Sequence, residues 1–205
     1  MTVVTCVEDL RRLHQRRVPK MFYDYAESGS WTETTFRRNK DAFDEIRLRQ
    51  RVAKDISTRK IVGTMLGEIQ RMPVAIAPTG LTGMQHANGE ILAAQAAEEF
   101  GVPFTLSTMS ICSIEDVAGQ TRKPFWFQLY VMKDREFIAD LILELERKKV
   151  KAIGVDVLFD SPTEPKKDKY LKETLRKITV PLFISYTTTS SAVTEEQLEY
   201  LNEFV

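Results

Sequence analysis

Hydrogen-bonding side chains follow three apolar segments of the chain, at the point where each segment ends. Thr79 closes the first segment, Ser107 the second, and Gln128 and Tyr130 the third. The segments are Met72–Gly80 (MPVAIAPTG), Val102–Ser110 (VPFTLSTMS) and Pro124–Val131 (PFWFQLYV). A helical pattern separates each segment from the next, which is typical of a parallel βα array. In such arrays the carboxyl ends of the strands form the ligand site, so these side chains are candidates for binding chemistry.

The side chains of the third segment can act together. The Gln128 amide both donates and accepts hydrogen bonds. Tyr130 lies two residues further on and therefore points to the same face of its strand. A Ser, a Gln or a Tyr at a strand end can also have a purely structural role. The residue types by themselves do not decide between a structural role and a role in binding.

Helices and a hairpin are expected around the array. Three helices precede it: Thr5–Arg17, Lys20–Gly29 and Thr32–Phe43. Alternation predicts a short strand at Ile46–Val52, and two glycines predict a hairpin within Asp55–Gln70. Three further helices are expected after the apolar segments: Asn88–Phe100, Ser113–Ala118 and Arg135–Lys149.

The two histidines of the chain are not expected to be catalytic. His14 lies on the polar face of the first predicted helix and is expected to be solvated. His86 lies in the first βα loop, in the sequence MQHANGE, where a structural or capping role is expected.

The composition is that of an ordinary globular chain without net charge. At 205 residues the chain can bury one sizeable core or two small ones. Lys+Arg 29 and Asp+Glu 29 cancel, so no long-range field draws the chain to nucleic acid or to an anionic membrane. No apolar run approaches the length of about 18 residues that a membrane helix needs, so a cytoplasmic location is expected. Cys6 and Cys112 are too few and too scattered for a disulfide framework or a metal site.

Five stretches within the first 150 residues resemble the FMN-dependent α-hydroxy-acid dehydrogenase/oxidase family, and most of all its bacterial L-lactate dehydrogenases. The stretches are RRVPKMFYDYAESGS, FRRNKDAFDEIRLRQRV, MPVAIAPTGLTGMQHANGE, FTLSTMSICSIEDVA and KPFWFQLYVMKDRE, in the family's order and spacing. The resemblance implies an α/β fold, the first half of a (β/α)8 barrel preceded by a helical and hairpin region. It implies three parts: residues 1–70 ahead of the barrel, 71–150 with three βα units, and 151–205 as a divergent tail.

The resemblance also implies roles for individual residues. Ala77, Pro78 and Thr79 follow the first strand, where backbone groups of the family face the flavin ring of FMN. Ser107 and Gln128 match a hydroxyl and an amide that contact the pyrimidine edge of the flavin. Tyr130 and Tyr25 match residues that contact a small 2-hydroxy acid such as L-lactate, with neighbouring Tyr23 as the alternative to Tyr25.

The fourth and fifth strands depart from the family pattern. At equal spacing, Asp156 stands where the family has a threonine on the flavin, and Leu158 stands where it has the aspartate that orients the catalytic histidine. Ser185 replaces the lysine near flavin N1. No histidine follows His86 and no arginine follows Arg176. The resemblance therefore implies that FMN binding is weakened and that the chain by itself lacks the groups needed for turnover.

Residues 140–205 resemble part of a CHASE-type sensor domain of the second class, through the motif GVDVLFDSPTEP. This second resemblance predicts a chimera joined within Arg135–Lys149. Two alternatives to an enzyme follow. The tail could carry a ligand-sensing or interaction module, with Asp160–Asp168 as its exposed loop. The half-barrel could instead be inactive and self-associate into a homo-oligomer through its open sheet edges.

Overall fold

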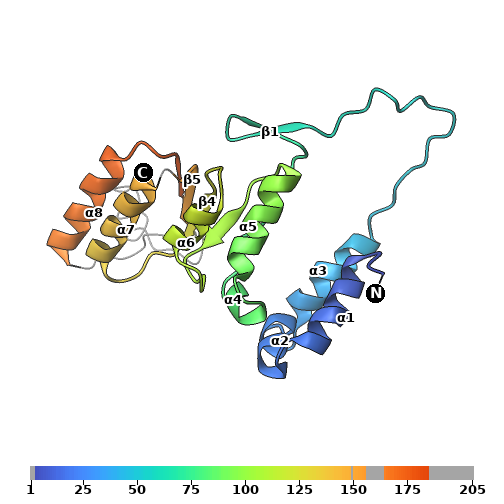
Figure 1. Cartoon of the computed structure of the whole chain (residues 1–205), viewed down its shortest axis with the longest axis horizontal. Coiled ribbons are helices and arrows are strands. Elements are labelled where there is room, and N and C mark those ends of the chain that lie inside the picture. Colours follow the sequence, from blue (N-terminus) through green and yellow to red (C-terminus); the bar gives the residue numbers. More distant parts are fainter. Residues whose placement is uncertain (1–2, 149, 156–163, 185–205) are drawn as a thin grey trace. The chain divides into compact units, whose positions relative to one another are not determined.

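The computed structural model describes residues 3–148, 150–155 and 164–184. The chain divides into two compact units. The first comprises Met1–Ile61 with Met84–Ala87, and the second comprises Val62–Gly83 with Asn88–Val205. Figure 1 labels the helices and strands of both units. The division into parts at residues 70 and 150 stays a prediction.

Three helices build the first unit: α1 (Val7–Arg17), α2 (Lys20–Glu27) and α3 (Thr34–Asp44). Arg11 on α1 joins the first two. Its guanidinium donates to Glu8 at 2.6 Å, to the Tyr23 hydroxyl at 2.6 Å and to Glu27 at 3.4 Å. The Arg11 hydrogen bond, with smaller effects of nearby cations, lowers the pKa of Glu8 to about 2. The three helices confirm the elements expected here to within a few residues.

Two expectations for the first unit are wrong. His14 is half-buried rather than solvated, because its Nε2 lies 2.8 Å from Gln85 Oε1 and its ring packs against Tyr23 at 5.2 Å. The segment Ile46–Val52 forms no strand, and all its side chains are exposed. Its alternation of aliphatic and charged residues needs a neighbouring strand to become a sheet, and the described part of the chain offers it none.

A hairpin opens the second unit. Strands β1 (Gly63–Met65) and β2 (Glu68–Gln70) pair antiparallel. The two turn residues, Leu66 and Gly67, have φ angles of +48° and +78°. Positive φ at both positions is the type I′ geometry that matches the twist of a two-residue hairpin. The hairpin is confirmed, although it covers only the last part of the segment predicted for it.

A parallel sheet follows in the order β3-β4-β5-β6. Its strands are β3 (Thr105–Ser107), β4 (Trp126–Leu129), β5 (Ala152–Val155) and β6 (Leu182–Ile184). A parallel bridge between Ile76 and Phe104 adds the first apolar segment at the β3 edge. Strands consecutive in sequence are thus neighbours in space, which is the arrangement of a βα-barrel wall.

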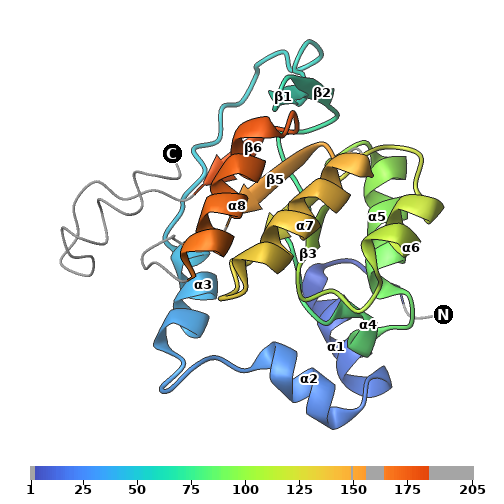
Figure 2. The same ribbon diagram turned by 90° about the vertical axis from the view of Figure 1, so that its left-hand side faces the viewer.

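Helices connect the strands, and most of them cover one face of the sheet. They are α4 (Thr82–Gln85), α5 (Gly89–Phe100), α6 (Ile114–Gln120), α7 (Arg135–Arg147) and α8 (Pro165–Lys177). Figure 2 shows α7 and α8 side by side over β5 and β6. Side chains at the N-termini of two helices accept hydrogen bonds from backbone N–H groups. At the start of α6, Ser113 forms a capping box with Asp116, and at the start of α7, Asp134 accepts from the first N–H groups of the helix.

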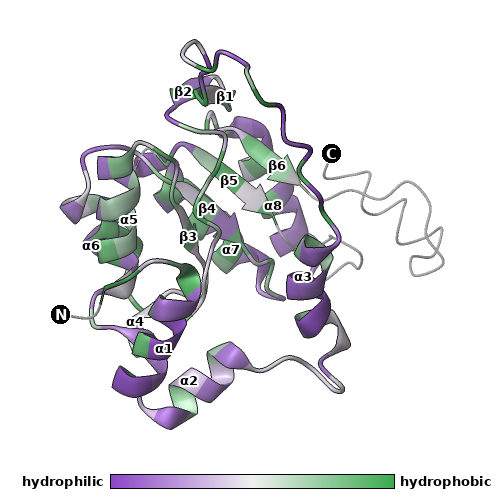
Figure 3. Cartoon of the chain, turned by 90° about the vertical axis from the view of Figure 1, so that its right-hand side faces the viewer, coloured by the Kyte–Doolittle hydropathy of each residue, from purple (hydrophilic) through white to green (hydrophobic). Residues whose placement is uncertain are grey.

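The core lies between the helices and this face of the sheet. Alternating residues of β3, β4 and β5 are buried there, including Leu106, Phe127, Leu129 and Ile153. Against them pack residues of α7 and α8 that have no exposed surface: Ile138, Ile142, Leu145 and Leu171. Figure 3 looks at β4, β5 and β6 from the side away from α7 and α8, and much of these strands is coloured as hydrophobic.

The tail continues the βα alternation through β5, α8 and β6. The exposed loop predicted at Asp160–Asp168 is wrong in its last part, because α8 begins at Pro165 and Asp168 is 5% exposed. Pro at the first helical position favours this start. Asp168 forms an ion pair with Arg135 of α7 at 3.7 Å. Asp156, Leu158, residues 160–163 and Ser185 lie outside the described residues.

Candidate functional site

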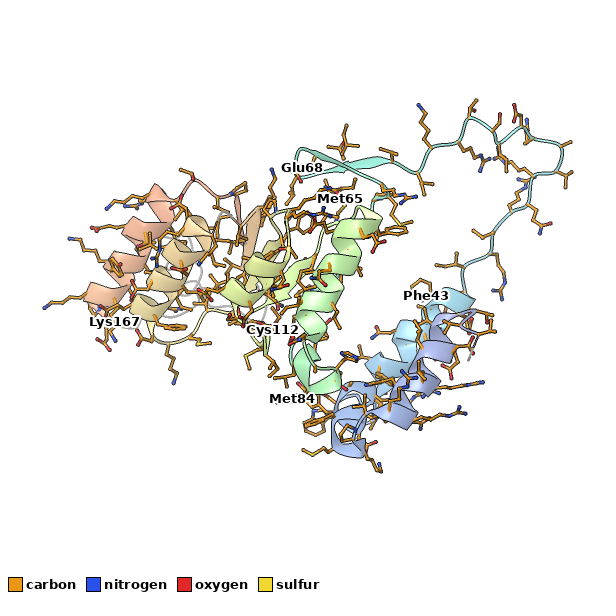
Figure 4. All side chains as sticks on the ribbon, viewed as in Figure 1. Phe43, Met65, Glu68, Met84, Cys112 and Lys167 are labelled. Carbon is orange, nitrogen blue, oxygen red and sulfur yellow. The ribbon has the colours of Figure 1, made fainter. Side chains whose placement is uncertain are left out.

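A cavity of about 610 Å³ opens on the sheet face away from the helices. Its walls come from the sheet, the hairpin and the first apolar segment. The lining residues are Met65, Leu66, Pro78, Thr105, Trp126, Phe127, Gln128, Ala152, Gly154, Val155 and Phe183. Met65 is labelled on the hairpin in Figure 4. None of the described lining residues is charged, and the volume is usual for a small-molecule site. The cavity thus suits a largely apolar group with a few polar atoms.

Ser107 and Gln128 meet at the carboxyl ends of β3 and β4, where they are direct neighbours in the parallel register. The Ser107 hydroxyl donates to Gln128 Oε1 at 3.0 Å, and it accepts from the Met109 N–H at 3.1 Å. Ser107 is 3% exposed. With its oxygen facing Ser107, the Gln128 amide has a fixed orientation at the wall of the cavity.

The strand register continues the row formed by Ser107 and Gln128 across the sheet. Gln128 pairs with Gly154 of β5, and Gly154 pairs with Phe183 of β6. A Cβ added at Gly154 would approach only the Phe127 carbonyl, at 3.9 Å. The space beside Gln128 on the β5 side is therefore open, whereas any larger residue at 154 would fill it. Gly154 and Phe183 were not expected from the sequence as site residues, because a glycine and an apolar residue within a strand carry no chemical signal.

The turn after the first apolar segment reaches the same cavity through Pro78. The Thr79 hydroxyl donates to the Ala77 carbonyl at 3.4 Å, and the Thr79 carbonyl accepts from the Thr82 hydroxyl at 3.0 Å. Ala77 and Thr79 are exposed. The backbone groups of this turn are thus partly engaged within the turn itself, and Pro78 is its contribution to the cavity wall.

The two tyrosines predicted as substrate ligands belong to different units, Tyr130 to the second and Tyr25 to the first. Tyr130 is half-buried just after β4, and its N–H donates to the Thr108 hydroxyl at 3.1 Å. Tyr25 belongs to the first unit and is 65% exposed, whereas Tyr23 is 7% exposed. Of the two tyrosines on α2, Tyr23 is therefore the one that points inward within its unit. Tyr130 is not among the described residues that line the cavity.

Glu90 is a buried polar residue that the sequence did not indicate as a candidate site residue. It is the second residue of α5 and only 2% exposed. Its Oε1 accepts from the N–H groups of Gly83 and Ile111, at 2.9 Å and 3.0 Å. In sequence, a glutamate in the first turn of a helix is ordinarily an exposed partner of the helix dipole. The sequence does not reveal that Glu90 is buried, because its hydrogen-bond partners are backbone N–H groups, which are not tied to any residue type. His86, by contrast, is exposed, and its Nδ1 lies 2.8 Å from the Ala87 carbonyl.

These features define a class: a parallel βα wall with hydrogen-bonding residues at the carboxyl ends of its strands, facing an uncharged cavity. A model of the FMN-dependent dehydrogenase family matches residues 14–202. The chain belongs to this family, and FMN is the family's cofactor. The match extends through residues 151–202, which favours one family along the whole chain over the sensor-domain resemblance of the tail.

Curated relatives are L-lactate dehydrogenases. That of Xanthobacter autotrophicus is 45% identical over 140 residues, which are 68% of this chain and 36% of the relative. That of Vibrio cholerae is 43% identical over 153 residues, which are 75% of this chain and 39% of the relative. The chain thus spans well under half the length of these relatives.

Solved structures support the fold. A soluble mutant of the membrane-associated (S)-mandelate dehydrogenase from Pseudomonas putida is 33% identical, with a TM-score of 0.70 over 91% of this chain and 53% of that one. The monotopic membrane protein (S)-mandelate dehydrogenase is 30% identical, with a TM-score of 0.72 over 98% of this chain and 60% of that one. The fold expected from the sequence, part of a (β/α)8 barrel, is therefore confirmed. No helix in the described ranges has the length and apolar character to cross a bilayer.

Proposed function

We propose that this chain forms the flavin-ring side of an FMN-dependent 2-hydroxy-acid dehydrogenase of the L-lactate type. The observation that carries the proposal is the Ser107–Gln128 hydrogen bond at the edge of the uncharged cavity. A flavin ring presents a broad apolar surface with donors and acceptors along one edge. An amide held by a neighbouring hydroxyl complements such an edge, because its free orientation has already been removed.

The residues present fit the ring of FMN better than its phosphate. Pro78, Gln128 and Gly154 supply a stiff turn, a directed amide and open space around one cavity. In βα-barrels the phosphate is commonly held by loops after the seventh and eighth strands. The described strands correspond to the first five, counting the Ile76 segment. We therefore assign Ala77–Thr79, Ser107 and Gln128 to the ring, and no described residue to the phosphate.

The substrate class follows from the relatives and stays part of the proposal. When bound, the flavin takes up the hydride equivalent released as a 2-hydroxy acid becomes a 2-keto acid. Tyr130 and Tyr25 are proposed to contact the hydroxyl or carboxylate of that acid, as implied by the family pattern. A proton acceptor is also needed, and the 205-residue sequence has no histidine after His86. The chain by itself is thus proposed to hold flavin weakly without oxidising L-lactate. The cytoplasmic location expected from the sequence also stays a prediction.

Absorption spectroscopy tests the proposal directly. The purified chain is incubated with excess FMN and desalted, and its visible spectrum is recorded. A retained flavin spectrum supports the assigned ring site, whereas a colourless protein, together with no quenching of FMN fluorescence in a titration, contradicts it. Adding L-lactate without oxygen then tests turnover: bleaching of the bound flavin would contradict the proposed loss of chemistry.

Replacing Gln128 with alanine is expected to weaken FMN binding about tenfold. Loss of one hydrogen bond costs about 0.5–1.5 kcal/mol, and 1.4 kcal/mol corresponds to about tenfold in affinity. FMN fluorescence titration measures the effect. Gln95→Ala is the matched control, because it removes an amide from α5 in the same unit, where Gln95 Nε2 donates to the Gln120 carbonyl at 3.1 Å. Equal losses in the two variants would contradict the assigned role of Gln128.

Self-association is a second candidate, favoured by one specific observation. Phe183 lies on β6 at one end of the described sheet, lines the cavity and is 49% exposed. A sheet edge beside an exposed apolar face favours pairing with another chain. Sedimentation velocity checks this alternative. A concentration-independent monomer would exclude a homo-oligomer built on this edge.

A further inference from the structure

Glu90 connects two loops that belong to different βα units. Gly83 lies in the first loop, which begins at the Ala77–Thr79 turn, and Ile111 lies in the second loop, which begins after Ser107. One carboxylate oxygen accepts the N–H groups of both residues. Since the side chain is 2% exposed, these two hydrogen bonds replace the water that Oε1 of a glutamate normally keeps. Each loop is thereby fixed to the same atom.

The two loops also touch directly, at two closely packed glycines. A Cβ at Gly83 would lie 2.6 Å from the Ile111 Cβ, and a Cβ at Gly80 would lie 3.1 Å from the Met109 Cβ. The Leu81 N–H donates to the Met109 carbonyl at 2.9 Å. The glycines allow the close approach, and the carboxylate holds the approaching backbones in place. Glu90 therefore lies at a close contact between two loops, in addition to lying in the first turn of a helix.

A short chain of hydrogen bonds leads from the tied loops to the proposed ring site. Met109, which contacts the first loop, donates its N–H to the Ser107 hydroxyl at 3.1 Å. Ser107 in turn donates to Gln128 Oε1 at 3.0 Å. A shift of the second loop would move the Met109 N–H and leave Ser107 free to rotate. The orientation of the Gln128 amide thus depends on where the second loop lies.

We propose that Glu90 is a positioning residue for the flavin site, which ties the first and second βα loops together and so fixes Ser107 and Gln128 against the ring. The proposal rests on the proposed function for its ligand. The tie between the loops is independent of that function and can be measured separately. Glu90 touches neither reacting atoms nor, on this assignment, the flavin itself.

The charge state of Glu90 agrees with this role. Burial on its own would raise the pKa of Glu90, but the N–H groups of Ile111 and Gly83 favour the charged form, and the resulting pKa lies below its usual range. Burial, followed by the Glu90 carboxylate, raises the pKa of the neighbouring Cys112 thiol, with Asp116 adding to the effect. Cys112 is labelled in Figure 4 in the loop ahead of α6. At neutral pH the carboxylate is thus charged beside a protonated thiol.

Two variants of Glu90 separate hydrogen bonding from charge. Glu90→Gln keeps an oxygen that can accept both N–H groups, whereas Glu90→Ala removes it. We expect FMN affinity to fall at least tenfold in Glu90→Ala and to stay within about threefold of the wild type in Glu90→Gln. Val117→Ala is the control for stability, because it removes fully buried methyl groups from α6 in the same unit. Its FMN affinity is expected to stay unchanged wherever circular dichroism shows the variant folded.

Amide NMR tests the tie without FMN. The amide protons of Gly83 and Ile111 are expected to shift together on acidification, as Glu90 takes up a proton below its usual pKa, and both are expected to lose this response in Glu90→Ala. Independent behaviour of the two amides, or unchanged amide shifts in Glu90→Ala, would overturn the proposal. The proposal would also be overturned if folded Glu90→Ala bound FMN with an affinity within twofold of that of the wild type. If the wild type binds no FMN while the two amides still titrate together, the proposed function fails and the loop tie stands.

Discussion

Replacing Asp168 with alanine is expected to lower the free energy of unfolding of the second unit by about 3–5 kcal/mol. Asp168 on α8 pairs with Arg135 on α7, and both side chains are only 7% exposed. The loss is large because the substitution removes the buried carboxylate that offsets the cost of burying the Arg135 guanidinium. Removing the charge therefore exposes a desolvation cost that the ion pair had offset.

The second unit can be followed by its own tryptophan. The chain has two, and Trp31 belongs to the first unit while Trp126 belongs to the second. In a Trp31→Phe background, urea unfolding monitored by Trp126 fluorescence reports on the second unit alone. Glu173→Ala is the matched control, since its pair with Lys169 on the same helix is exposed at 46% and 79%. Its loss should stay below about 0.5 kcal/mol.

The combined variant Arg135→Met, Asp168→Leu distinguishes the loss of the charge pairing from a simple packing defect. Buried ion pairs replaced as a whole by apolar residues often leave stability unchanged or higher. We expect the double variant to recover most of the stability lost in Asp168→Ala. A double variant as unstable as Asp168→Ala would show that the pair has a shape or hydrogen-bonding role that apolar side chains do not supply.

The sequence predicted the βα array well because its signals are local. The helix Gly89–Phe100 differs by one residue from its prediction, and a buried alternation places β3 and β4 within the segments predicted for them. The segment Ile46–Val52 was mistaken for a strand, because alternation says nothing about whether a partner strand is available. Asp168 was expected in an exposed loop, because its neighbours are polar and its partner Arg135 lies 33 positions earlier in the sequence. Errors of this kind arise wherever a residue's environment is set by a distant segment.

The sequence predicted only part of the candidate site, and the rest was missed for a related reason. Ser107 and Gln128 could be placed at neighbouring strand ends from the strand order alone, and the structure joins them by a hydrogen bond. Whether they bind FMN stays a prediction. Glu90 could not be found, since its partners are the backbone N–H groups of Gly83 and Ile111, and no side-chain type marks such partners in a sequence. Gly154 and Phe183 became visible only through the sheet register.

Replacing Ile142 with alanine is expected to destabilise the second unit by about 2–5 kcal/mol, the usual cost of removing a large aliphatic side chain from a core. Ile142 lies in the middle of α7 and has no exposed surface, as do Ile138 and Leu145 on the same helix. The parallel sheet lies against this row, so the cavity left by three missing carbons cannot be filled by water or relieved by a loop.

A graded series makes this expectation strict. Ile142→Val removes one carbon and should cost about 0.5–1.5 kcal/mol, and Ile142→Ala should cost several times more. Phe137→Ala on the same helix is the control, because Phe137 is 50% exposed and its removal opens no enclosed cavity. Urea unfolding in the Trp31→Phe background measures all three. If Phe137→Ala proved as costly as Ile142→Ala, the face of α7 that packs on the sheet would have been assigned wrongly. If instead the costs follow burial, α7 and β5 form one packed layer across the position where a chimeric joint was expected, and the barrel wall is continuous from the family-like strands into the tail.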